Sequence, residues 1–137
     1  MSLISVILYL SMMKVGISME KKAFFNDNIF EITLANNYYR KEIFTGQHSQ
    51  VVIMSVPIGQ EIGEEVHTVD QVLVFVQGSG QAIINDVITD VYAHNLVFVP
   101  AGSKHNFKNS GSEDLKLFTI YAPAEDKPGT LEKTKPE

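Results

Sequence analysis

Short apolar runs rich in β-branched residues dominate the hydrophobic pattern from Phe24 onward, with almost no helical periodicity. Each run is four to seven residues long and is bounded by turn residues, which is the pattern of buried strands. The predicted strands cover residues 50–56, 71–76, 96–99 and 115–121. Many short strands separated by regular turn signals predict an all-β sandwich or barrel with little or no helix.

Several of these runs are apolar on both alternating faces. We therefore expect one face to line a barrel and the other to lie against a second sheet or a second subunit. If the outer face lies against a second subunit, the protein is a homodimer, and this is the oligomeric state that we expect.

The composition excludes some classes of partner and some kinds of catalysis. The chain has 137 residues, the length of one domain, and a formal net charge of −5 with Arg40 as its single arginine. Such a surface repels phosphate backbones, so we expect no nucleic-acid partner. Cysteine is absent, which excludes disulfides and thiol catalysis, and any metal must take nitrogen and oxygen ligands.

The chain divides into residues 1–22 as an N-terminal extension, 23–123 as the barrel and 124–137 as an exposed tail rich in Lys, Glu, Pro and Thr. The apolar run at residues 1–13 is shorter than the roughly 20 residues of a membrane span. Its positive charges follow the run, whereas a secretory signal has them in front. We therefore expect a cytoplasmic protein whose start codon is overcalled, with Met12, Met13 or Met19 as the true first residue; export by a signal-like segment is the alternative.

Two windows carry candidate chemistry. Glu65 and His67 are two apart, so on a strand they point to the same face. A short turn at residues 68–70 places Gln71 on a neighbouring strand facing the same way. His105 opens a strand after a Pro–Gly turn and can approach from across the barrel.

The two windows resemble the paired motifs of the cupin superfamily. The family's first motif is Gly, five residues, His-x-His, three or four residues, Glu, six residues, Gly. The chain reads Gly59, five residues, Glu65-x-His67, three residues, Gln71, six residues, Gly78. The second motif, Gly, five residues, Pro-x-Gly, two residues, His, three residues, Asn, is matched by His94, Pro100-x-Gly102, His105 and Asn109.

Further stretches, including residues 44–50, 61–67, 99–102 and 129–135, resemble small single-domain cupins of the mannose-6-phosphate-isomerase-like subgroup. The resemblance covers roughly residues 24–136. It implies a double-stranded β-helix, or jelly-roll barrel, with its site in the barrel mouth.

The chain departs from the family at three motif positions. Glu65 stands where the family has His, and Gln71 where it has Glu. The resemblance therefore implies one divalent ion, Fe, Mn, Ni or Zn, held by Glu65, His67, Gln71 and His105. His94 replaces a glycine, which predicts a turn with positive φ.

Each candidate residue also has an ordinary structural interpretation. Gln71 can hydrogen-bond a metal-bound water instead of the metal, and Glu65 and His67 can be merely hydrogen-bonded in a vacant site. Arg40 is expected to make a structural ion pair. The remaining polar residues are expected at exposed strand edges (Glu61, Glu64) or in turns (Asp70, His48), and the aromatic residues Phe75, Phe98 and Phe107 in the barrel core or pocket.

These features predict a metal-dependent enzyme acting on a small, oxygen-rich substrate resembling a sugar or keto acid. The subgroup's label implies isomerisation, in which proton transfer falls to Glu65, water or the substrate itself. Sugar phosphates fit less well, since Lys104 and Lys108 are the only cations near the second motif. The alternatives are an Fe(II) dioxygenase, favoured by the two-histidine, one-carboxylate set, and a non-catalytic small-ligand-binding cupin.

Overall fold

The computed structural model describes residues 2–7 and 22–137. The predictions for the N-terminal extension concern residues that lie for the most part outside this description. In the described ranges, no helix is both long and apolar enough to cross a membrane.

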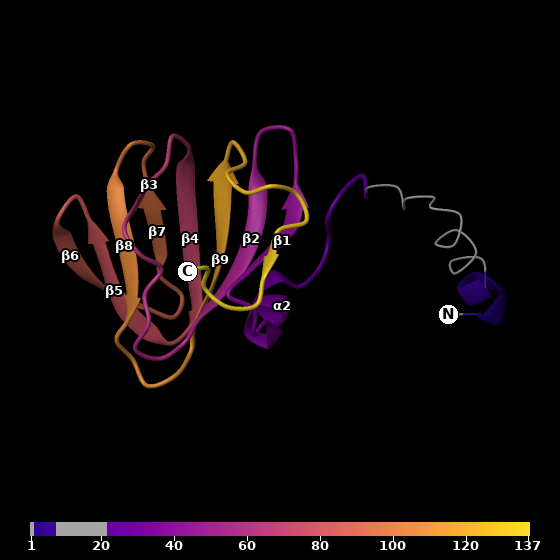
Figure 1. Cartoon of the computed structure of the whole chain (residues 1–137), viewed down its shortest axis with the longest axis horizontal. Coiled ribbons are helices and arrows are strands. Elements are labelled where there is room, and N and C mark those ends of the chain that lie inside the picture. Colours follow the sequence, from indigo (N-terminus) through magenta and orange to yellow (C-terminus); the bar gives the residue numbers. More distant parts are fainter. Residues whose placement is uncertain (1, 8–21) are drawn as a thin grey trace.

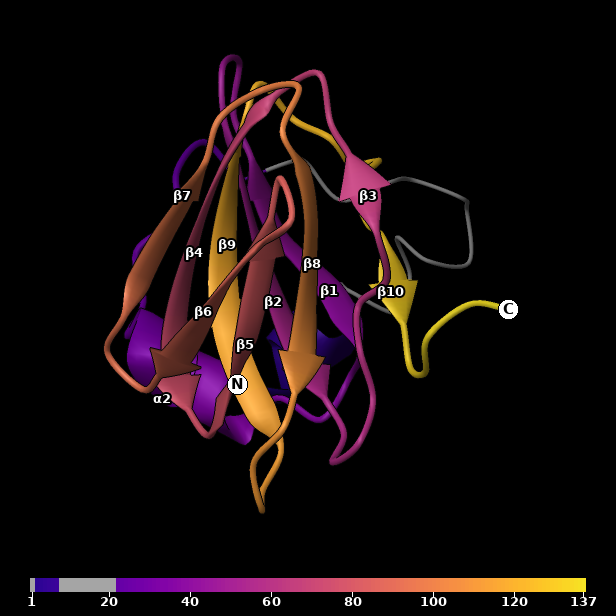
Figure 2. The ribbon, with the colours of Figure 1, turned by 90° about the vertical axis from the view of Figure 1, so that its left-hand side faces the viewer.

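Two antiparallel sheets face each other (Figures 1 and 2). The six-stranded sheet has the order β10-β1-β2-β9-β4-β7, and the four-stranded sheet has the order β3-β8-β5-β6. The described elements are α2 (Ile29–Ala35), β1 (Arg40–Thr45), β2 (Gln50–Val56), β3 (Glu65–Val66), β4 (Asp70–Gln77), β5 (Ser79–Ile84), β6 (Val87–Tyr92), β7 (Leu96–Val99), β8 (Lys104–Asn109), β9 (Leu115–Ala122) and β10 (Leu131–Glu132). The predicted all-β, double-stranded β-helix fold is thus confirmed.

The core lies between the two sheets and is built by alternate residues of the strands. The central pairs β4–β9 and β2–β9 keep their buried residues in register, as in the row Phe75–Leu117–Met54. Since successive side chains of a strand point to opposite faces, this register gives the barrel one continuous apolar interior. Its most deeply buried apolar members include Val52, Met54, Val56, Leu73, Phe75, Phe107, Leu115 and Leu117.

The hydrophobic pattern indicated neither the shorter strands β1, β5, β6 and β10 nor helix α2. It starts at the N-cap Asn28, whose side chain accepts a hydrogen bond from the Glu31 amide at 3.1 Å. Phe30 packs edge-on against Phe118 of β9, with ring centroids 5.7 Å apart. The helix therefore contacts the outer face of the large sheet, where we expected a second sheet or a second subunit.

Strand β7 corrects one core prediction. Phe75 and Phe107 are buried as expected, but Phe98 is 53% exposed. Val99 of the same strand is buried, and Phe98, one residue earlier, points to the opposite, outer face.

The turns follow the sequence signals. His94 has φ of 79°, which confirms the positive φ predicted from its place in a glycine position. Asn85 and Asp86, with φ of 48° and 68°, form the two-residue β5–β6 hairpin turn.

The C-terminal tail runs along the edge of the large sheet. Its short strand β10 pairs with β1, with Arg40 opposite Glu132. Gln50 donates to the Asp126 carbonyl at 2.7 Å and accepts from the Asp126 amide at 3.0 Å. These bonds hold the start of the tail beside the first residue of β2, and Figure 2 shows the rest of the tail passing beside β1.

Candidate metal centre

Strand pairing brings three of the candidate ligands together. Glu65 of β3 lies directly opposite His105 of β8, and residues opposite each other in an antiparallel pair share a face. His67 follows β3, and its ring centroid lies 5.0 Å from that of His105. One ligand atom from each of the three residues lies within 4.8 Å of the others.

Hydrogen bonds on the far side of both imidazoles determine which nitrogen faces the site. Nδ1 of His105 lies 2.9 Å from the Ser103 carbonyl oxygen, and Nδ1 of His67 lies 3.1 Å from Oε1 of Glu125. A carbonyl and a carboxylate can only accept, so Nδ1 of His105 carries the proton in the neutral ring, and Nδ1 of His67 carries it when a metal ion takes the place of a proton on Nε2. Each Nε2 therefore presents a lone pair, and an acceptor behind Nδ1 is the usual support for a metal-ligating histidine.

The inward-facing atoms fit a cation. Nε2 of both histidines is buried and has no hydrogen-bond partner. Nε2 of His67 nevertheless lies 2.8 Å from Oε2 of Glu65, so in the neutral ring two lone-pair-bearing atoms face each other. A divalent ion between such atoms relieves their repulsion, and two imidazoles with one carboxylate suit Fe, Mn, Ni or Zn.

Gln71 lies on β4, beside Tyr121 of β9, and is only 4% exposed. Its Nε2 donates to the Thr119 hydroxyl at 3.1 Å, and that hydroxyl donates to the Val72 carbonyl at 2.9 Å. The side-chain oxygen of Gln71 is buried without a hydrogen-bond partner. Direct ligation by Gln71 remains a prediction.

Arg40 makes the ion pair expected of it, and does so at the centre of an acidic group. Its guanidinium lies 3.0 Å from Glu132, 3.8 Å from Asp126 and 3.9 Å from Glu65. The side chain is 14% exposed and also stacks over the Tyr39 ring, 5.2 Å from its centroid. Arg40 therefore links the candidate ligand Glu65 to two carboxylates of the tail.

Burial and neighbouring charges change the ionisation of this group. Burial raises the pKa of the Asp126 carboxyl above its usual value, and the opposing effect of Arg40 does not cancel it. Burial by itself lowers the pKa of Arg40, but Tyr121, Asp126 and Glu132 raise it above its usual value. The guanidinium is thus a permanent cation among partly buried carboxylates.

Two tyrosines beside the site stay neutral. Burial raises the pKa of the Tyr39 phenol to about 12 and also raises that of Tyr121. Tyr121 packs edge-on against His67, with ring centroids 5.7 Å apart. Both phenols are therefore protonated at neutral pH.

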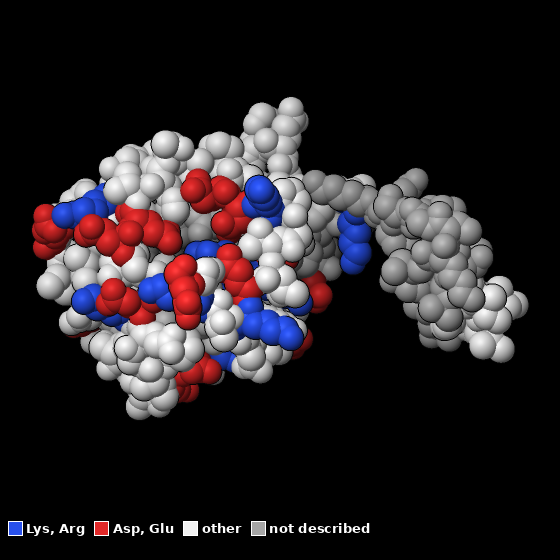
Figure 3. All heavy atoms as spheres, viewed as in Figure 1, with Lys and Arg blue, Asp and Glu red and all other residues white. Residues whose placement is uncertain are grey.

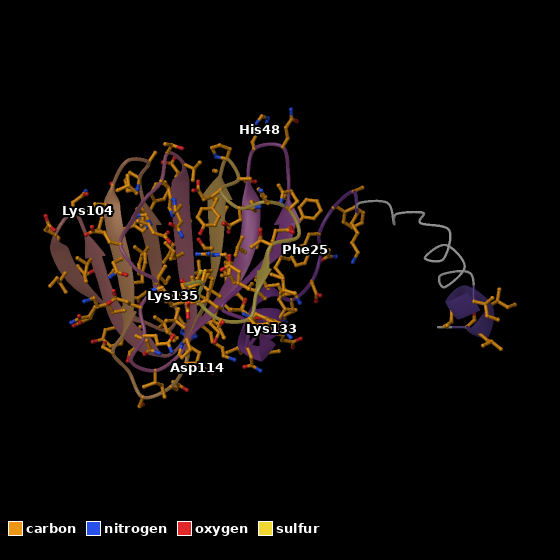
Figure 4. The ribbon with its side chains drawn as sticks, viewed as in Figure 1. Phe25, His48, Lys104, Asp114, Lys133 and Lys135 are labelled. Carbon is orange, nitrogen blue, oxygen red and sulfur yellow. The ribbon has the colours of Figure 1, made fainter. Side chains whose placement is uncertain are left out.

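The other polar residues fall outside the triad. Glu64 is 67% exposed and lies 3.9 Å from Lys104, and Glu61 lies 3.5 Å from Lys108. Asp70 accepts a hydrogen bond from the Ala101 amide at 2.9 Å, which ties two turns together. His48 lies at the tip of the β1–β2 hairpin (Figure 4).

Sequence reasoning missed Glu125, Asp126 and Glu132, which we call the tail acids. They lie in a segment of low apolar content that we expected to be an exposed extension. The subgroup resemblance, which includes residues 129–135, is the one sequence signal that involves this segment.

The fold and the triad define a cupin with a candidate metal site, and comparison with known proteins agrees. Residues 52–121 match the Cupin_2 family, described as Cupin domain. The chain belongs to this family.

Three similar proteins support the assignment. The chain is 41% identical over 115 residues to YrkC of Bacillus subtilis, covering 79% of this chain and 62% of YrkC. It is 36% identical to L612 of Acanthamoeba polyphaga mimivirus, covering 80% of this chain and 72% of L612. The crystal structure of BH2720 from Bacillus halodurans superposes with a TM-score of 0.80 at 36% identity, covering 81% of this chain and 89% of that one.

Proposed function

We propose that this cupin is a metal-dependent enzyme acting on a small, oxygen-rich substrate, with aldose–ketose or keto–enol isomerisation as the reaction. The observation that carries the proposal is the convergence of two unpartnered Nε2 lone pairs and one carboxylate within 4.8 Å. A divalent ion bound there supplies Lewis acidity toward a carbonyl or hydroxyl oxygen. Glu65, His67 and His105 are its ligands, with Gln71 as the proposed fourth.

Both isomerisations begin with removal of the proton on a carbon next to the oxygen-bearing group, and Glu65 is the residue we assign to this transfer. In aldose–ketose isomerisation the proton is returned to the adjacent carbon, and in keto–enol isomerisation it is placed on the carbonyl oxygen. One oxygen of Glu65 faces His67 at 2.8 Å, and the other lies 3.9 Å from Arg40. Arg40 restrains the carboxylate, while Glu125 and the Ser103 carbonyl restrain the two imidazoles. The mannose-6-phosphate-isomerase-like subgroup, which stretches such as residues 44–50 and 129–135 resemble, carries a label of the same reaction class.

The test is proton exchange in D2O, followed by NMR, with a panel of aldoses and ketoses and protein reconstituted with Mn or Zn. The proposal expects metal-dependent deuterium incorporation at the carbon next to the carbonyl, and its loss in His105→Ala. Metal-loaded protein that exchanges no proton on any of them would contradict isomerisation.

The same ligand set favours one second candidate, an Fe(II) dioxygenase. Oxygen consumption by the Fe(II) protein, absent from the Zn protein, would support this candidate. Ligand-dependent thermal stabilisation without any product would instead support a binding module.

We also propose a homodimer, formed through β7 and its neighbour β4. Leu96 and Phe98 are 61% and 53% exposed and lie opposite Val74 and Val72 of β4. β7 is an edge strand of its sheet, and an exposed apolar edge is a site of pairing with another chain. Sedimentation velocity is expected to show a dimer for wild type and a monomer for Phe98→Lys, while Ile58→Lys, at another exposed apolar residue, stays dimeric. A monomeric wild type would refute this.

A further inference from the structure

The tail acids lie beside the triad, where the C-terminal segment runs along the edge of the large sheet. Glu125 contacts the back of His67 at 3.1 Å, while Asp126 and Glu132 contact Arg40. All three keep part of their side chains in solvent, with exposed fractions of 33%, 17% and 27%. In Figure 3, acidic side chains form a band across the upper part of this face of the barrel.

The formal charge of this environment is negative even with a metal in place. The tail acids and Glu65 carry −4, Arg40 carries +1, and a divalent ion adds +2, which leaves −1. Both histidines count as neutral because metal ligation requires the neutral ring.

Arg40, the two lysines of β8 and Lys135 already have partners. Each of the three guanidinium nitrogens of Arg40 lies within 3.9 Å of a carboxylate. Lys104 pairs with Asp86 at 2.9 Å, Lys108 pairs with Glu61 at 3.5 Å, and Lys135 donates to the Glu61 carbonyl at 3.0 Å. In Figure 4, Lys104 lies at the side of the barrel formed by β6 and β8, and Lys135 lies nearer the middle of the face. An anionic ligand would have to compete with these partners for positive charge.

We infer that the site selects uncharged, hydroxyl- or carbonyl-bearing ligands and disfavours anionic ones, and that the tail acids determine this selectivity. The inference rests on the proposed function, since it takes the metal site as the place where the ligand binds. It narrows the substrate from sugar-like or keto-acid-like compounds to uncharged, sugar-like ones. Sugar phosphates are disfavoured for the same reason.

The test compares two ligands of nearly the same shape, oxalate and its neutral diamide oxamide, by calorimetric titration of metal-loaded protein. Asp126→Asn and Glu132→Gln each remove one negative charge without touching a proposed metal ligand. Removing a unit charge about 7 Å from the dianion oxalate, in a medium of effective dielectric about 35, changes affinity roughly a hundredfold. Oxalate affinity is therefore expected to rise about a hundredfold in each variant, and oxamide affinity to stay within twofold.

Two controls separate charge from other effects. Glu113→Gln removes an exposed acid whose side chain makes no recorded contact with the site, and both affinities are expected to stay at the wild-type value. Because like-charge repulsion is screened by salt, oxalate affinity of wild type is expected to rise between low and moderate ionic strength.

Metal content is measured for each preparation first. Wild type that folds but takes up no metal contradicts the proposed function. Fully metal-loaded protein whose oxalate affinity falls or stays constant in both Asp126→Asn and Glu132→Gln overturns the inference alone.

Discussion

Replacing Arg40 by Met tests whether this residue holds the acidic group around the site together. The substitution keeps an apolar side chain over Tyr39 but removes the cation that lies 3.0–3.9 Å from three carboxylates. Removing one partner of a fully buried ion pair costs about 3–5 kcal/mol, because the remaining charge is uncompensated. The three acids here are 17–30% exposed, so solvent screens part of the cost. We expect Arg40→Met to lose about 2–4 kcal/mol of unfolding free energy at pH 7.

The loss of unfolding free energy in Arg40→Met is expected to depend on pH. Arg40 lowers the pKa of Asp126, which burial already raises above its usual value, so the pKa rises further in the variant. A carboxyl whose folded-state pKa exceeds the unfolded value destabilises the protein above that pKa, and the penalty disappears as pH falls through it. The difference between variant and wild type should therefore shrink between pH 7 and about pH 4, the ordinary carboxyl range.

The assay is urea unfolding of both proteins with EDTA present, so that no metal contributes. Lys104→Met is the matched control, because Lys104 also lies within 4.0 Å of two acids but is 41% exposed. Exposed pairs often contribute nothing measurable, and we expect none here. The reasoning is refuted if Arg40→Met behaves like Lys104→Met, or if its loss is the same at pH 7 and pH 4.

Three further predictions concern single side chains. Glu125→Ala is expected to weaken metal affinity about 10–100-fold, measured by competition with a chelator, because His67 loses the acceptor on Nδ1; Glu113→Ala should not. Gly80→Ala is expected to lower the unfolding free energy, measured in urea, by about 3 kcal/mol or more. The added Cβ overlaps the Lys108 carbonyl oxygen in the β5–β8 pair. Gly46→Ala meets only an ordinary contact with the Ser49 carbonyl and is the neutral control. The unfolding free energy of His94→Gly is expected to equal that of wild type or exceed it by up to about 1 kcal/mol, since the φ of 79° at this position disfavours residues with a Cβ. A clearly lower unfolding free energy would contradict this.

Much of the fold could be predicted because the strands carry continuous β-branched runs. The predicted runs at 50–56 and 96–99 coincide with β2 and β7, and those at 71–76 and 115–121 differ from β4 and β9 by a residue at one or both ends. Helix α2 could not be predicted, because its seven residues are too few to show a helical period and include β-branched Ile and Thr. Its one local signal is the cap formed by Asn28 and Glu31.

The triad could be predicted because Glu65 and His67 share a strand face and the motif spacing brings His105 opposite. The tail acids could not, because their contacts join residues far apart in the chain. Glu125 contacts His67 across 58 positions, and Glu132 contacts Arg40 across 92. Such contacts leave no periodic pattern, and the polar composition of the tail is equally typical of an unattached end.

Elemental analysis of purified protein tests the central claim most directly. We predict close to one divalent ion per chain in wild type and in His48→Ala, where the altered histidine lies at the tip of the β1–β2 hairpin. We predict loss of that ion in both His67→Ala and His105→Ala. Folded wild type that takes up no metal after reconstitution, or variants that retain it at the wild-type level, would contradict the account.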